Sequence, residues 1–196
     1  MAGQPQARIS IEEYLEIERG SEERHEYYDG EIFAMVGASL SHNLLVSALV
    51  KLLSTQLGTR CLVCVNDMRV HIPATGLYTY PDLLVVCDKP RLADERGETL
   101  LNPTVIAEVL SDSTEAYDRG RKFDHYQTIE SLTDYLLVAQ DEAKIEHYAR
   151  QQEGWLLTRA KGLDDVLPLP PIGCELRLAE VYEQVEVADR STLGSA

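Results

Sequence analysis

The chain has 196 residues, of which 44% are hydrophobic and 26% are charged, a balance typical of one globular domain rather than a disordered chain. No apolar run approaches the ~18 residues of a membrane-spanning helix, and the polar start lacks the apolar middle of a signal peptide. We therefore expect a cytoplasmic protein without membrane segments. The formal net charge of −15 argues against tight duplex binding, which normally rests on Lys and Arg contacts to phosphates.

The first half of the chain predicts two helices and four strands. Ser10 and Glu13 form a capping box for a helix that ends at Gly20. Apolar residues at helical spacing predict a second helix over 41–57, for which Gly58 is a natural stop. The predicted strands cover 31–36, 60–65, 68–72 and 82–87. In the third of these, Arg69 and His71 alternate with apolar residues, which is a half-buried pattern.

The second half of the chain continues this alternation of strands and helices. Residues 88–102 are polar and predict a surface loop. A strand over 104–110 is followed by a helix that runs roughly over 117–129, which Ser113 and Thr114 can cap. The remaining predicted elements are a strand over 135–139, a hairpin of 144–150 and 155–161 that turns near Gly154, an extended segment over 164–173, and a short helix over 178–185.

The order helix, strand, strand, strand, helix, strand in the middle of the chain predicts the fold class. It indicates an α/β sandwich around a mixed sheet. No internal linker separates two parts, so we expect a single domain over 1–196, with its core at about 24–185. The ends, 1–8 and 187–196, are expected to be mobile tails.

The four cysteines show no metal-binding spacing. Cys61 and Cys64 form a C-x-x-C, but a zinc site needs a second pair nearby, and Cys87 and Cys174 lie far apart in sequence. Positions three apart on a strand also point to opposite faces. We expect all four side chains to act as small buried hydrophobic groups, in keeping with the cytoplasm.

Two carboxylates interrupt apolar strands. Asp82 precedes the run 83–86, and Glu108 lies inside 105–110. A buried carboxylate needs a cation, a hydrogen-bond donor or a metal as its partner, and two on neighbouring strands ~4.8 Å apart can share one ion. Oxygen ligands without clustered Cys or His favour Mg²⁺ or Mn²⁺. The alternative is a strand-end Asp that caps a loop and a core Glu that pairs with an Arg.

A basic cluster follows the second carboxylate. It consists of Arg119, Arg121, Lys122 and His125, and we expect it to line a groove that binds phosphates. Bound cations would cancel part of the remaining negative charge.

Tyr80-Pro81-Asp82 and Glu108-Val109-Leu110 resemble the PD-(D/E)XK motif of restriction-endonuclease-like nucleases. A longer ordered series resembles a bacterial family of restriction endonucleases that was first catalogued as a domain of unknown function. The series is His25-Glu26-Tyr27-Tyr28-Asp29-Gly30-Glu31, Ser41-His42, Pro81-Asp82, Glu108-Val109-Leu110-Ser111, Ser113-Thr114, Asp118, Lys122 and Tyr126. The resemblance implies a restriction-endonuclease-like αβββαβ core with a mixed central sheet. The N-terminal helix and the C-terminal β-hairpin would extend that core.

One position departs from the superfamily motif. Leu110 stands where the motif has its catalytic lysine, and the resemblance implies that Lys122, on the following helix, takes that role. A surface lysine paired with Asp118, four residues earlier, is the alternative. The resemblance also implies that Glu26 can join the site. His42 is a further candidate, as a phosphate contact, a helix cap or a structural histidine.

These residues predict a metal-dependent endonuclease that hydrolyses phosphodiester bonds in DNA. Asp82, Glu108 and Lys122 are the expected catalytic residues, and Asp82, Glu108 and the backbone carbonyl of Val109 are the expected ligands of Mg²⁺ or Mn²⁺. Two alternatives stay open: a catalytically silent nuclease-like binding module, and a carboxylate-pair hydrolase of sugars that needs no metal. A homodimer would supply the two sites that cutting both strands requires.

Overall fold

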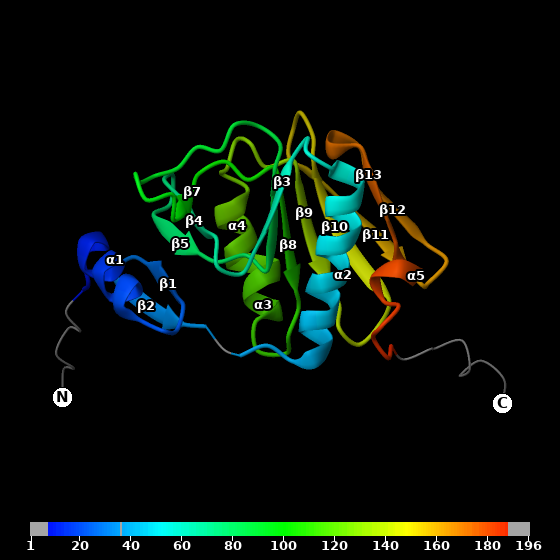
Figure 1. The fold of residues 1–196 in the computed structure, drawn as a ribbon, viewed down its shortest axis with the longest axis horizontal. Coiled ribbons are helices and arrows are strands. Elements are labelled where there is room, and N and C mark those ends of the chain that lie inside the picture. Colours follow the sequence, from blue (N-terminus) through cyan, green and yellow to red (C-terminus); the bar gives the residue numbers. More distant parts are fainter. Residues whose placement is uncertain (1–7, 36, 188–196) are drawn as a thin grey trace.

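The computed structural model describes residues 8–35 and 37–187, and its centre is a six-stranded mixed sheet (Figure 1). Its strand order is β11-β10-β9-β8-β6-β3. The strands are β3 (Leu62–Val65), β6 (Leu83–Val86), β8 (Val105–Val109), β9 (Asp134–Val138), β10 (Lys144–Arg150) and β11 (Trp155–Lys161). Only the β8–β9 pair is parallel among the pairs of this sheet. The predicted mixed sheet and the predicted C-terminal hairpin are both confirmed.

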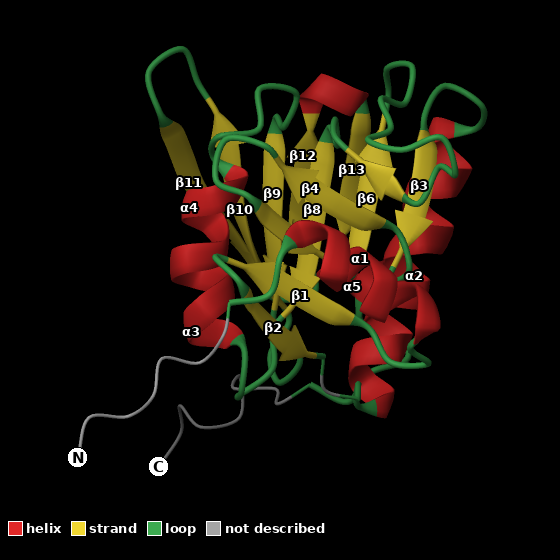
Figure 2. Cartoon of the chain, turned by 90° about the vertical axis from the view of Figure 1, so that its left-hand side faces the viewer, coloured by secondary structure: helices red, strands yellow, loops and turns green. Residues whose placement is uncertain are grey.

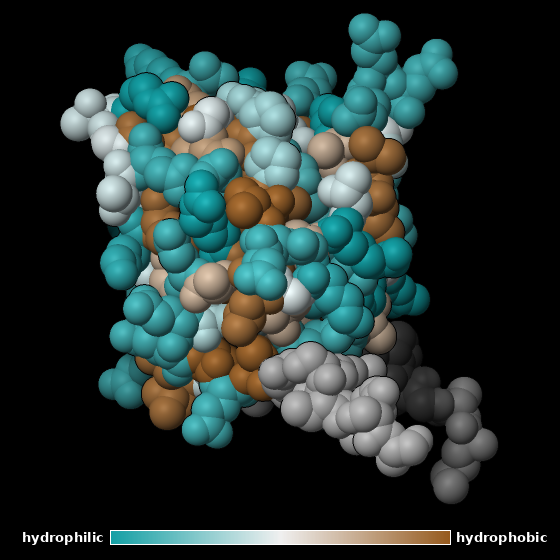
Figure 3. Space-filling view, turned by 90° about the vertical axis from the view of Figure 1, so that its right-hand side faces the viewer, coloured by the Kyte–Doolittle hydropathy of each residue, from teal (hydrophilic) through white to brown (hydrophobic). Residues whose placement is uncertain are grey.

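One face of this sheet is covered by α2 (Leu40–Leu57) and α5 (Leu178–Val181). The apolar stripe of α2, including Leu45, Leu49 and Leu53, is fully buried against it. Each such leucine contributes about 1.5–3 kcal/mol through removal from water. A two-stranded sheet of β12 (Val166–Leu169) and β13 (Cys174–Arg177) completes this side. The outer surface of this side of the molecule is mainly hydrophilic, with apolar residues interspersed (Figure 3).

The opposite face carries a short helical segment and, beyond it, a five-stranded sheet (Figures 1 and 2). The helical segment comprises α3 (Glu115–Tyr117), a π-helical turn (Asp118–Lys122) and α4 (Phe123–Tyr126). The second sheet has the order β2-β1-β5-β4-β7. Its strands are β1 (His25–Tyr28), β2 (Glu31–Ala34), β4 (Arg69–Ile72), β5 (Leu77–Thr79) and β7 (Thr99–Leu100).

The N-terminal helix α1 (Ile11–Gly20) packs on this second sheet through aromatic side chains. The predicted capping box is present, because Ser10 and Glu13 bond reciprocally to each other's backbone N–H. Tyr14 is fully buried, and its hydroxyl donates to the carbonyl of His25 at 2.8 Å. This packing fixes the position of β1. Of the predicted tails, residues 1–7 and 188–196 lie outside the described residues.

The αβββαβ core is formed by α2, β3, β6, β8, the α3–α4 segment and β9. The β4 segment lies in the second sheet instead, and its predicted half-buried pattern is wrong at Arg69, which is only 4% exposed. The Arg69 guanidinium donates to Thr99 and Tyr80, so a polar side chain is satisfied inside the fold. The segment 88–102, predicted as a surface loop, contains the short strand β7 near its end. This strand pairs in parallel with β4.

The helix predicted over 117–129 is shorter and interrupted. It begins at Glu115, changes to a π-helical turn at Asp118 and ends at Tyr126. Neither predicted cap forms a side-chain cap bond, because the hydroxyls of Ser113 and Thr114 contact Ser111 instead. A π turn accommodates one extra residue and often marks a functional segment.

The segment after the hairpin is also more structured than predicted. The expected extended stretch 164–173 contains β12 and then a 3₁₀ turn, Pro170–Ile172. The expected helix over 178–185 ends at Val181. No helix within 8–35 or 37–187 is long and apolar enough to cross a bilayer.

The expectation for the cysteines is wrong at Cys61 and Cys87, which form a disulfide. Pairing of Leu62 with Val86 in the antiparallel β3–β6 ladder places the two cysteines directly opposite each other, with Cα atoms 4.1 Å apart. Cys64 is half-buried and Cys174 buried, and both are free thiols. The cysteines therefore lend no support to a cytoplasmic location, since disulfides are uncommon there.

Candidate active site

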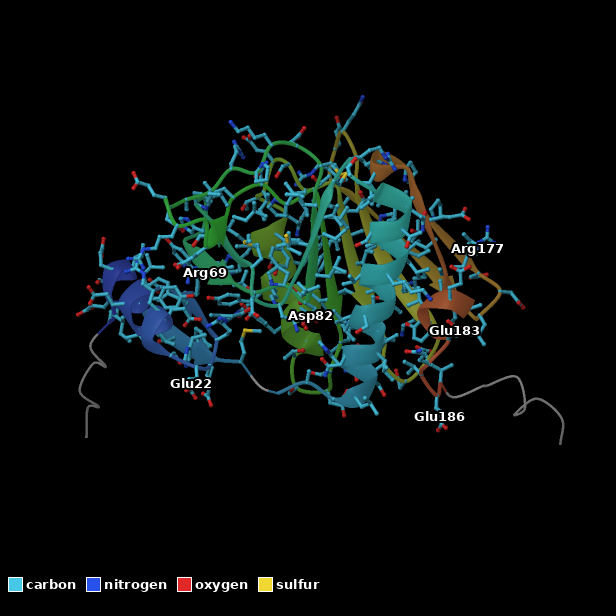
Figure 4. The ribbon with its side chains drawn as sticks, viewed as in Figure 1. Glu22, Arg69, Asp82, Arg177, Glu183 and Glu186 are labelled. Atoms are coloured by element: carbon cyan, nitrogen blue, oxygen red, sulfur yellow. A yellow bond between two sulfur atoms is a disulfide. The ribbon has the colours of Figure 1, made fainter. Side chains whose placement is uncertain are left out.

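Asp82 and Glu108 face each other across two neighbouring strands. Leu83 pairs with Ala107 in the antiparallel β6–β8 ladder, so Asp82, one residue earlier, stands opposite Glu108. Opposed residues of an antiparallel pair point to the same face. The backbone N–H of Asp82 donates to Glu108 Oε2 at 3.3 Å, and that of Val109 donates to Asp82 Oδ2 at 2.8 Å. The predicted placement of the two carboxylates on one face is confirmed. Figure 4 shows Asp82 near the middle of the molecule.

Lys122 reaches the same point from the π-helical turn. Its Nζ lies 2.9 Å from Glu108 Oε1, 3.3 Å from Glu26 Oε1 and 3.5 Å from Asp118 Oδ1. Its side chain is 7% exposed, so the alternative of a surface lysine is wrong. The structure therefore brings Asp82, Glu108 and Lys122 together, as the sequence predicts.

Burial dominates the electrostatics of this cluster. It raises the pKa of Glu108 to about 8, against the lowering effect of Lys122. Burial also raises the pKa of Asp118, again against Lys122. For Lys122 itself, burial lowers the pKa, but Glu108 and Glu26 outweigh it and hold the pKa well above its usual range. The ammonium is thus charged, while Glu108 accepts a proton readily near neutral pH.

Glu26 comes to the site from β1 in the second sheet. The hydroxyl of Thr79 donates to its carboxylate, and Lys122 lies on the same oxygen. The ring centroid of Tyr117 lies 5.9 Å from the Lys122 ammonium. The expected position of Glu26 at the site is confirmed, and it explains why the packing of α1 and β1 matters to the cluster.

His42 lies in the first turn of α2 and contacts Asp82. Its Nε2 is 3.0 Å from Asp82 Oδ2. The suggested role of His42 as a helix cap is wrong, because the hydroxyl of Ser39 caps α2 by accepting from the His42 backbone N–H at 3.0 Å.

The predicted basic groove is not formed by the expected cluster. Lys122 is buried among carboxylates, and Arg119 is paired with Glu115 and Glu146. Of the four residues, Arg121 alone is exposed. Lys122 and Arg119 pair with carboxylates inside the fold, because buried carboxylates need counter-charges.

Two further side chains complete the site. The carboxylate of Asp118 lies 3.5 Å from the Lys122 ammonium, and the hydroxyl of Tyr126 donates a hydrogen bond to Glu108 Oε1 at 2.8 Å. Both residues belong to the ordered series that carries the family resemblance, but neither is predicted from sequence to have a role at the site, and Asp118 is otherwise treated only as the partner of a surface lysine. The signal that could have found both is the spacing of four from Asp118 to Lys122 and from Lys122 to Tyr126, because such residues share one helix face.

The donor chemistry suits a hard divalent cation. Asp82 and Glu108 present carboxylate oxygens, and the Val109 carbonyl lies next in the chain. Within 8–35 and 37–187, no three His, Cys, Asp or Glu side chains converge on a point that could hold a metal. Mg²⁺ fits this set, because it commonly binds through one or two carboxylates and keeps several waters.

The αβββαβ core and its opposed carboxylates define the restriction-endonuclease-like class of folds. A crystal structure described as a "putative nuclease belonging to DUF820", from Anabaena variabilis, shares this fold with a TM-score of 0.73, at 20% identity over 89% of this chain and 98% of that chain. The family model of Uma2, described as "Putative restriction endonuclease", matches residues 11–179. The chain therefore belongs to the Uma2 family.

Two proteins from Synechocystis, both named as uncharacterized, are similar to this chain over most of its length. One is 39% identical over 181 residues, covering 91% of this chain and 93% of its own length. The other is 38% identical over 156 residues, covering 79% of this chain and 88% of its own length.

Proposed function

We propose that the protein is a divalent-metal-dependent endonuclease that hydrolyses phosphodiester bonds in DNA. The observation that carries this proposal is the opposed pair of Asp82 and Glu108, joined by the buried ammonium of Lys122 at 2.9 Å from Glu108. Membership of a nuclease family supports a nucleic acid as the substrate.

Asp82, Glu108 and the backbone carbonyl of Val109 would hold Mg²⁺ or Mn²⁺. When bound, the cation supplies a Lewis acid that polarises the phosphoryl group and acidifies water. Glu108 would hold the cation in its deprotonated form, so it would have to release its proton near neutral pH, where its pKa of about 8 lies. Tyr126 keeps Glu108 oriented through its hydroxyl, at 2.8 Å from Oε1.

Lys122 supplies the positive charge that the scissile phosphate needs in the transition state. It is a preorganised charge in a water-poor site, where electrostatic stabilisation is strongest. Glu26 and Asp118 hold its ammonium from the other sides, at 3.3 and 3.5 Å. These contacts fix its direction, and a phosphoryl oxygen would replace one of the three carboxylates to accept a hydrogen bond from the ammonium.

The test is a cleavage assay with single-stranded and double-stranded DNA and RNA, with and without Mn²⁺. We expect DNA to be cut only when metal is present, and Asp82→Asn to be inactive. Asp124→Asn is the matched control, because it removes the same charge from an exposed position on α4 and should cut like the wild type. Metal-independent cleavage, or full activity in Asp82→Asn, overturns the proposal.

A catalytically silent binding module is the second candidate, and one observation favours it. Lys122 is satisfied by Glu108, Glu26 and Asp118 without any added ion, so the cluster can serve as a structural ion-pair network. The same assay separates the two candidates. Retention of DNA on the protein without turnover, under all metal conditions, would identify the silent module.

A further inference from the structure

Two exposed aromatic side chains lie on the β1–β2 hairpin, beside the candidate active site. Phe33 is 48% exposed and Tyr28 is 39% exposed. Among the large hydrophobic side chains that are exposed within 8–35 and 37–187, these two are the aromatic ones. Single exposed apolar residues are common, but two aromatic rings on one hairpin next to a catalytic cluster are a feature to be explained.

The alternation of side chains along β1 and β2 turns both rings towards the site. Tyr27 and Ile32 pack in the aromatic cluster under α1. Their neighbours Tyr28 and Phe33 therefore point to the opposite face of the hairpin. Glu26 lies on that same face, because it stands directly opposite Phe33 in the antiparallel ladder. The rings thus share a face with a carboxylate of the candidate active site.

The α4 helix borders these rings from the other side. Figure 1 shows the β1–β2 hairpin on the same side of the six-stranded sheet as the α3–α4 segment. The ring of Tyr28 lies 4.7 Å from that of His125, in an edge-on arrangement. Burial lowers the pKa of His125, and the nearby Arg121 guanidinium lowers it further. Since Arg121 is exposed, the hairpin and α4 together present aromatic rings and one free guanidinium to solvent.

We propose that Tyr28 and Phe33 form a stacking platform for unpaired bases, and that the substrate of the site is single-stranded DNA. The inference rests on the proposed function, because it names the form of DNA that the site takes. Stacking of bases on aromatic side chains is typical of proteins that bind single strands with little sequence preference. The two residues are diagonal neighbours across the β1–β2 ladder, ~7–8 Å apart, so each ring can take its own base.

The charge of the chain favours a single strand over a duplex. Duplex binding rests chiefly on Lys and Arg contacts to phosphates. The chain has a formal net charge of −15, and both Arg119 and Lys122 are held by carboxylates. Glu31, which stands opposite Tyr28, is exposed and repels phosphates close to the rings. Stacking needs no positive charge, but it needs bases that are not already paired and stacked inside a duplex.

The test measures binding of three labelled probes by fluorescence anisotropy in EDTA, so that metal-dependent cleavage cannot occur. The probes are a single strand of about 10 adenine nucleotides, an abasic strand of the same length, and a duplex of that length. We expect the adenine strand to bind most tightly. The abasic strand carries the same phosphates without bases, so equal affinity for it overturns the proposal. Tighter binding of the duplex overturns it as well.

Variants of the two rings test the platform itself. Phe33→Leu and Tyr28→Leu keep an apolar side chain without its ring, and each should weaken binding of the adenine strand about 5–150-fold. Phe33→Trp should bind at least as tightly as the wild type. Leu156→Ala is the matched control, because Leu156 is 52% exposed on β11, at the far edge of the six-stranded sheet. It should bind like the wild type.

The outcomes separate this inference from the proposed function. Wild-type affinity in Phe33→Leu overturns the platform, and this variant also decides if Tyr28→Leu does not fold. Ring-dependent binding without any cleavage in Mn²⁺ overturns the proposed function and leaves the platform in place. Metal-dependent cleavage of duplexes and single strands at equal rates, unchanged in Phe33→Leu, overturns the inference alone. A raised KM with an unchanged kcat for single strands in Phe33→Leu supports both.

Discussion

Replacement of Lys122 by methionine separates the proposed catalytic role of its charge from the structural role of that charge. Methionine keeps much of the apolar stem but leaves Glu108, Glu26 and Asp118 without their shared cation. Removal of one partner from a buried ion pair costs about 3–5 kcal/mol. The pKa of Glu108 is about 8 even with the lowering effect of the ammonium, so without Lys122 the pKa rises further and this carboxyl group stays protonated at pH 7. We therefore expect the lower end, about 3 kcal/mol.

In the metal-free protein, that loss lowers the melting temperature by about 6–12 °C, because a chain of this size shifts by about 2–4 °C per kcal/mol. Mn²⁺ binding is retained, since an ammonium is no ligand and its removal frees Glu108. Metal also replaces the lost positive charge, so Mn²⁺ should stabilise Lys122→Met more than the wild type. Cleavage should fall by about 10²–10³-fold, the usual cost of one lost transition-state donor.

The assay combines melting scans with and without Mn²⁺ and single-turnover cleavage of DNA. Lys89→Met is the control, because this lysine is exposed and follows the end of β6 opposite to Asp82. It should melt and cut like the wild type. Cleavage at the wild-type rate by Lys122→Met would refute the role of its charge, and loss of Mn²⁺ binding would refute the separation of charge from ligation.

Three further predictions follow from the same cluster and from the disulfide. Folded Glu108, with a pKa of about 8, binds its proton more tightly than the unfolded chain, so metal-free stability should fall as pH rises from about 5 to about 8, and Glu108→Gln should flatten this slope in pH-dependent denaturation. Mn²⁺ at 100 times its dissociation constant should stabilise the wild type by about 2.7 kcal/mol in a melting scan, and an equal shift in Asp82→Ala would count against the site. Reduction of the Cys61–Cys87 disulfide, which spans a sequence separation of 26, should destabilise the wild type by about 3 kcal/mol. The same reductant should leave the melting temperature of Cys61→Ser unchanged.

The carboxylate pair could be predicted from sequence because polarity within an apolar strand is costly and therefore conspicuous. Asp82 and Glu108 each interrupt such a run, and strand periodicity fixes the face to which they point. The position of Lys122 could also be predicted from local sequence, because residues spaced four apart lie on one face of a helix. The family resemblance supplied its proposed role.

Features that depend on long-range pairing could not be predicted. The Cys61–Cys87 disulfide follows from the register of β3 against β6, which no local pattern reveals. Arg69 looks exposed in its strand, yet the second sheet buries it beside Thr99. Short elements such as β7 carry too few residues for a periodicity. The π-helical turn likewise adds one residue without a compositional signature.

The most direct measurement is anomalous diffraction from a crystal of the wild type soaked in Mn²⁺. The central claim is that Asp82 and Glu108 together hold the catalytic cation. An anomalous peak between these two carboxylates, absent from Asp82→Asn crystals, is the predicted result. A map without a peak at this position at millimolar Mn²⁺, with the Lys122–Glu108 ion pair intact, would contradict the claim.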